Sequence, residues 1–278
     1  MLPKSQWDYE THDSKTYGSN ITKQIFEDAR FSYPKSLYAV EDALRLFTAH
    51  KPNALIIDFF AGSGTTLHAV NLMNARDGGR RRCILVTNNE VSVEEAAELS
   101  NKGIAPGDEL WNALGIARNV TWPRTVCSIK GVNINGKPLK GVYNDSEISM
   151  DEGFASNAVF YQLSFLESTT VALGMNTKEL LPVLWMKAGA IGKCPELPGG
   201  QNPSMLILPE NKFAVLISEQ AYAAFEEALT EHPEIQTVFL ATDYEENYRA
   251  MVKNLNVEHT YQLYRDYLDH FRLSAGRN

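Results

Sequence analysis

Asp58-Phe59-Phe60-Ala61-Gly62-Ser63-Gly64-Thr65-Thr66 is the stretch that decides the fold of the first half of this 278-residue chain. An apolar run over 54–60 leads into its two glycines, and helical spacing then runs from Thr65 to about Ala75. Such a run is typical of a parallel strand buried on both faces. The glycines let the backbone turn tightly into a helix and approach a ligand closely.

The segments around this turn predict an α/β unit. A helix over 37–47 precedes the first strand, and an apolar strand over Cys83–Val86 is followed by Glu90 and a helix over 91–101. Strand, glycine turn, helix, strand, helix is the pattern of a doubly wound sheet. We expect an incoming segment over 1–30, this unit over 31–145 and a second α/β unit over 150–278, separated by the acidic, turn-rich residues 144–153.

The second unit alternates strand-like and helix-like segments. The predicted strands are 158–165, a hairpin of 205–208 and 213–217, and 237–242. The predicted helices are 177–188, 220–231, 244–255 and a closing helix over 261–271. No motif in this unit indicates chemistry, so we expect it to serve structure or assembly.

Two common phosphate-binding motifs do not fit the glycine turn. No lysine follows the glycines as in a P-loop, and Leu67 stands where a dinucleotide fingerprint has its third glycine. Asp58, at the end of the first strand, would repel phosphate but attract an ammonium group, and Glu90 after the next strand can accept hydrogen bonds from ribose hydroxyls. A ribose, no phosphate and a cationic amino-acid end describe S-adenosyl-L-methionine. The alternative is a turn that holds no ligand.

The charge pattern bears on nucleic-acid binding. A net charge of −8 argues against a uniformly basic nucleic-acid binder. Residues 110–143, however, contain five basic residues, two tryptophans and no acid. Contact of Arg118 and Arg124 with DNA phosphates is one interpretation. A solvated connector is the other.

Other functional classes lack a signal in this sequence. Its three cysteines are far apart and its six histidines lack metal-ligand spacing, so we expect neither a disulfide framework nor a metal site. No apolar run has the length of a membrane helix, and the first residues lack the apolar run of a signal peptide. These features predict a cytoplasmic protein that does not bind membranes.

The glycine turn resembles the cofactor motif of amino-directed DNA methyltransferases. Residues 31–37, Phe-Ser-Tyr-Pro-Lys-Ser-Leu, look like the Pro-Lys motif that precedes it in the permuted, beta-type members. Trp7, Asp8 and residues 71–78 are similar to type III restriction-modification methylation subunits. The resemblance implies a partial Rossmann-like, S-adenosylmethionine-dependent methyltransferase sheet and the following cofactor-binding set: Pro34, Lys35, Asp58, Phe59, Ala61, Gly62, Ser63, Gly64, Thr65, Thr66 and Glu90.

Each part of this set has an implied role. Asp58 and the backbone of 62–64 would hold the methionine part, Phe59, Thr65 and Thr66 would line its pocket, and Pro34 and Lys35 would close one side. Core packing could instead explain Phe59, solvation could explain Lys35, and helix capping could explain Thr65.

The family's catalytic tetrapeptide, Asp/Asn/Ser-Pro-Pro-aromatic, holds the amine of a flipped base, and these 278 residues do not contain it. In the permuted order it precedes the cofactor motif, so we expect a C-terminal fragment that does not methylate DNA by itself. The resemblance implies a site-specific DNA (adenine-N6) methyltransferase of a restriction-modification system, with DNA, a restriction subunit and a second copy of the chain as partners. The alternatives are a non-catalytic cofactor-binding or assembly module, and a small-molecule or RNA methyltransferase.

Overall fold

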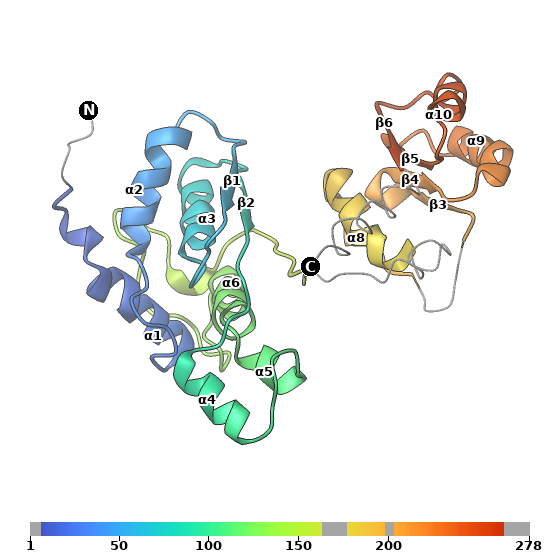
Figure 1. Cartoon of the computed structure of the whole chain (residues 1–278). Helices are drawn as coiled ribbons and strands as arrows, with labels where there is room; N and C mark the ends of the chain where they lie inside the picture. Colours follow the sequence, from blue (N-terminus) through green and yellow to red (C-terminus); the bar gives the residue numbers. More distant parts are fainter. Residues whose placement is uncertain (1–6, 163–176, 198–202, 264–278) are drawn as a thin grey trace. The chain divides into compact units, whose positions relative to one another are not determined.

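A computed structural model describes residues 7–162, 177–197 and 203–263. The chain divides into two compact units, Met1–Tyr161 and Gln162–Asn278 (Figure 1). The division falls beyond the acidic stretch 144–153, because Tyr143, Met150 and Phe154 pack into the core of the first unit. Each unit has its own sheet and its own core.

The first unit combines helices with a two-stranded parallel sheet. Its elements are α1 (Asn20–Phe26), α2 (Leu37–Thr48), β1 (Leu55–Asp58), α3 (Thr65–Asp77), β2 (Arg82–Leu85), α4 (Val93–Asn101), α5 (Glu109–Leu114) and α6 (Trp122–Lys130). β1 and β2 pair in parallel, with Ile57 opposite Ile84. The predicted order of strand, glycine turn, helix and strand is therefore confirmed.

The burial expected of the first strand is wrong. Leu55, Ile57 and Ile84 lie on one face of the sheet and are 47–49% exposed, because no described element covers that face. The strand is also shorter than the apolar run. Phe59 and Phe60 follow it in the turn and are 65% and 90% exposed.

The core of the first unit lies among its helices. Ile25 and Phe26 of α1, Leu37 of α2 and Leu72 of α3 are essentially inaccessible to solvent. The residues predicted as an incoming segment thus supply part of this core. The start of α2 is fixed by Ser36, whose hydroxyl accepts a hydrogen bond from the Ala39 amide at 3.3 Å.

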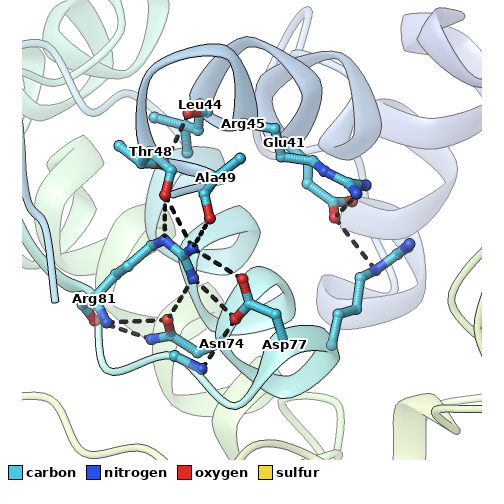
Figure 2. A network of polar contacts seen from close by, with 10 residues as sticks. Glu41, Leu44, Arg45, Thr48, Ala49, Asn74, Asp77 and Arg81 are labelled. Carbon is cyan, nitrogen blue, oxygen red and sulfur yellow. Dashed lines mark hydrogen bonds and ion pairs between the residues drawn. The ribbon is translucent and has the colours of Figure 1, made fainter. Parts of the chain in front are cut away.

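A buried arginine joins α2, α3 and the start of β2 (Figure 2). The Arg81 guanidinium donates to the carbonyl oxygen of Thr48 at 3.0 Å, at the end of α2. It also pairs with Asp77 on the last turn of α3 at 2.8 Å. The Asn74 side chain bonds both backbone polar groups of Arg81. This network satisfies helix-end carbonyls that would otherwise lack partners.

The second unit is built on a four-stranded sheet in the order β3-β4-β5-β6. Its elements are α8 (Thr177–Lys187), β3 (Met205–Leu208), β4 (Phe213–Leu216), α9 (Tyr222–Glu231), β5 (Thr237–Ala241), α10 (Glu245–Val252) and β6 (His259–Leu263). β3 and β4 form the predicted antiparallel hairpin, and β4, β5 and β6 are parallel. The predicted α/β alternation is confirmed here.

Two element predictions near the ends of this region fail. Residues 158–162 form no strand, and 163–165 lie outside the described residues. Tyr261 belongs to β6 and not to a closing helix, because residues 259–263 pair with β5 and the Tyr261 ring stacks on Phe239 at 5.4 Å between centroids. Residues 264–271 lie outside the described part of the chain.

Over the described ranges, no helix has the length and apolar character needed to cross a bilayer. The same ranges hold no group of three or more histidine, cysteine or acidic side chains placed to bind a metal ion.

Candidate functional site

The turn between β1 and α3 depends on two glycines with left-handed backbone. Gly62 has φ of 51° and Gly64 has φ of 77°, which other residues rarely adopt. A side chain at Gly64 would also meet Thr121, whose methyl carbon lies 3.3 Å from the position of the missing Cβ. The Gly64 amide donates to the Ala61 carbonyl at 2.8 Å, which closes the turn.

Asp58 joins the end of β1 to the start of α3. One carboxylate oxygen accepts from the Phe60 amide at 3.1 Å, and the other accepts from the Thr66 hydroxyl at 2.6 Å. The side chain is thereby held beside the first turn of the helix while remaining only half-buried. A fixed carboxylate at this point can attract a positively charged group.

A small hollow of about 60 Å³ lies over the turn. Its lining includes seven of the predicted residues, namely Lys35, Asp58, Ala61, Gly62, Ser63, Thr65 and Thr66. Phe31 and Tyr33 also line it. Sequence reasoning did not assign these two to the site, although they belong to the Pro-Lys segment that it singled out. The structure thus brings two sequence segments, 31–35 and 58–66, to one place.

Four predicted residues do not line this hollow. Gly64 is buried under Thr121, and Pro34 is buried with its carbonyl against Gly18. Phe59 is exposed, so it is not a core residue. Glu90 is exposed and follows the last residue of β2 by five positions; its carboxylate accepts from Asn88 at 3.0 Å. Its predicted contact with ribose stays a prediction.

The structure contradicts the prediction that Arg124 contacts DNA. The residue has no exposed surface, and its Nη1 donates to the hydroxyls of Ser63 and Thr65, each at 2.8 Å. Burial lowers the pKa of Arg124 to about 10, which leaves it charged at neutral pH. Sequence reasoning could not distinguish a buried cation from a solvated one in this basic segment. Arg118, by contrast, is exposed, and its guanidinium carbon lies 5.9 Å from the ring centroid of Phe160.

A buried histidine lies on the same helix as Thr65 and Thr66. His68 is 2% exposed, and its Nε2 is 2.8 Å from the Tyr143 hydroxyl. Burial, with a smaller contribution from the Arg124 charge, holds the pKa of His68 well below its usual value. The imidazole is therefore neutral at pH 7. It does not line the hollow, and a lone histidine in a helix gave no signal in the sequence.

Part of the first unit is similar to known proteins. A family model described as DNA methylase matches residues 2–101, which include the glycine turn, Asp58 and the segment 31–35. These residues of the chain are therefore similar to the DNA methylases. The DNA methylase match ends with α4, before the helix that carries Arg124.

Curated relatives agree with this family. The chain is 42% identical over 81 residues to type II methyltransferase M.KpnI of Klebsiella pneumoniae, covering 28% of this chain and 19% of that protein. It is 36% identical over 89 residues to the type III restriction-modification enzyme EcoPI Mod subunit of Escherichia phage P1, covering 32% of this chain and 13% of that one. The StyLTI Mod subunit of Salmonella typhimurium is 38% identical over 92 residues, 33% of this chain and 13% of its own. The chain thus matches less than a fifth of the length of each.

Proposed function

We propose that this chain is the cofactor-binding part of a site-specific DNA methyltransferase of a restriction-modification system that modifies the N6 amine of adenine. One observation carries the proposal. Asp58, Gly62 of the turn and the first residues of α3 line one hollow within the segment that matches the DNA methylases. The names of the type II and type III relatives support the restriction-modification setting.

The residues around the hollow fit the amino-acid end of S-adenosyl-L-methionine. A volume of 60 Å³ has room for roughly two water molecules at ~30 Å³ each, so only the charged groups of the amino-acid end, and not a nucleoside, would enter it. Asp58 would bind the ammonium, and the N-terminus of the 13-residue α3 would favour the carboxylate. When bound, the cofactor would supply the methyl group of its sulfonium for transfer to the base.

The remaining parts of the cofactor would meet residues outside the hollow and at its edge. The exposed Phe59 ring is available for the adenine, and the exposed Glu90 carboxylate can accept from ribose hydroxyls. Pro34 and Lys35 would close the side formed by the segment before α2. The uncovered apolar face of β1 and β2 also fits part of a larger, doubly wound Rossmann-like sheet, since such sheets carry helices on both faces.

The proposed function implies macromolecular partners. We propose DNA as the substrate and the cytoplasm as the location, and the exposed Arg118 would contact a DNA phosphate. The type III Mod relatives favour a restriction subunit as a further partner. A homodimer and an assembly role for the second unit belong to the same proposal.

Calorimetry with S-adenosylmethionine tests this function at Asp58. We expect Asp58→Asn to weaken binding by about tenfold or more, because it removes the charge opposite the ammonium while keeping one oxygen that can accept from Phe60 or Thr66. Asp145→Asn is the matched control. It removes the same charge from an exposed position outside the hollow, and asparagine tolerates the left-handed backbone there.

The control should bind as the unaltered chain does. Equal affinity of the Asp58→Asn variant and the unaltered chain would contradict the assignment of Asp58. Absence of binding by the unaltered chain would contradict the cofactor assignment itself.

A further inference from the structure

Two side chains around the start of α6 hold the glycine turn from behind. The Thr121 hydroxyl, immediately before α6, donates to the Gly62 carbonyl oxygen at 2.6 Å. Arg124, three residues later and on the same helical face, donates from Nη1 to both Ser63 and Thr65. The same nitrogen lies 3.5 Å from the Ser63 carbonyl oxygen. Three residues of the turn are thus fixed by a helix about sixty positions further along the chain.

The position of Arg124 is unfavourable for stability. Its Nε and Nη2 are buried without hydrogen-bond partners, and none of the ion pairs among the described residues involves it. A buried charge without a carboxylate partner destabilises a fold, and an apolar residue of similar size is often neutral or stabilising in its place. The nitrogen of Arg124 that does form hydrogen bonds, Nη1, bonds residues of the turn. A functional constraint would explain this arrangement.

The contacts among Arg124, Ser63 and Thr65 leave one hydroxyl hydrogen without an acceptor. Ser63 Oγ and Thr65 Oγ1 both accept from Arg124, and they lie 3.1 Å apart, so one of them can donate to the other. The hydrogen of the second hydroxyl then has no acceptor among these three groups. Both residues line the hollow. One of these two hydroxyls can therefore donate a hydrogen bond to a ligand in the hollow, while it accepts one from the charged guanidinium.

We infer that Arg124 is a positioning residue: it orients the Ser63 and Thr65 hydroxyls so that one of them donates to the carboxylate of the bound amino-acid end. Thr121 supports it by fixing the Gly62 carbonyl. The identity of the ligand rests on the proposed function. The orienting role itself rests on the contacts of Arg124 and does not require that the ligand be known.

The experiment compares Arg124→Met with the unaltered chain, using two ligands. S-adenosylhomocysteine has the amino-acid end, and 5′-methylthioadenosine lacks it. We expect the variant to lose about tenfold or more in affinity for the first and less than about twofold for the second. Its thermal unfolding temperature should be unchanged or higher, because the unpaired buried charge is gone. Lys130→Met, an exposed change on the same helix, should alter neither of the two affinities nor the unfolding temperature.

A conservative variant keeps the test decisive if methionine prevents folding. Arg124→Lys retains a charge and one donor nitrogen, so its affinity for S-adenosylhomocysteine should fall by about twofold to tenfold, while its affinity for 5′-methylthioadenosine should stay the same. Equal losses for both ligands together with a lowered unfolding temperature would show a purely structural role and overturn the inference. Unchanged affinity for S-adenosylhomocysteine would also overturn it.

Amide hydrogen exchange separates this inference from the proposed function. If the unaltered chain binds neither ligand, the proposed function fails, yet the role of Arg124 can still be measured. We then expect faster exchange at residues 61–66 in the Arg124→Met variant, with unchanged exchange in α2. Identical exchange in the turn would overturn the inference.

Discussion

Arg81 and Arg124 are both buried, but only Arg81 has a carboxylate partner. Arg81 pairs with Asp77 and caps the end of α2, whereas Arg124 bonds, within the described part of the chain, hydroxyl and carbonyl groups of the turn. The sequence shows both as ordinary cations. Burial decides their roles, because a guanidinium removed from water must form its hydrogen bonds with the protein groups around it. This is why the DNA contact predicted for Arg124 fails.

His68 makes the stability of the first unit sensitive to acid. Its pKa is well below the usual value in the folded state, so below about pH 6.5 the unfolded chain takes up a proton that the folded chain does not. Stability from this group is complete above that pH and is lost as the pH falls. Between pH 7.5 and 5.5 we expect the unaltered chain to lose about 1 kcal/mol more free energy of unfolding than His68→Gln, in which glutamine can still bond Tyr143. Urea unfolding at the two pH values measures this, and parallel pH dependence of the two proteins would contradict it.

At the scale of elements, Arg81 links the end of α2 to the last turn of α3. Replacing it by alanine leaves carbonyls at the end of α2 and the Asp77 carboxylate without their partner (Figure 2). We expect Arg81→Ala to lower the free energy of unfolding by about 2 kcal/mol or more. Arg80→Ala, its exposed neighbour, should change it by less than about 0.5 kcal/mol. Urea unfolding of both variants checks the contrast, and similar losses would mean that the network contributes little.

The elements with strong local signals were predicted well. The helix after Ser36, the glycine turn, and the hairpin of β3 and β4 have capping or turn residues that act within a few positions. The prediction of a helix over 261–271 was wrong for its first residues, because aromatic residues suit a strand as well as a buried helix. There, pairing with β5 decided the outcome. The first strand likewise ends at Asp58, before the end of its apolar run, because Phe59 and Phe60 lie in the turn.

At the scale of the whole molecule, the two units have separate cores. The first is centred on α1, α2, α3 and α6, and the second on β4, β5 and α9. We therefore expect residues 1–161, produced alone, to give a cooperative thermal transition and to retain the affinity of the full chain for S-adenosylmethionine. Circular dichroism and calorimetry measure the two properties. A truncated protein that is unfolded would show that the first unit depends on the second.

The sequence by itself determined the glycine turn, the carboxylate beside it and the alternation of helices and strands, since these depend on backbone preferences and on neighbours along the chain. Only the tertiary structure decided that Phe31 and Tyr33 line the hollow, that Glu90 does not, and that Arg124 lies beneath the turn. These outcomes depend on which segments meet in space and on which side chains lose contact with water. The spacing of residues along the chain does not indicate which segments meet or which side chains become buried.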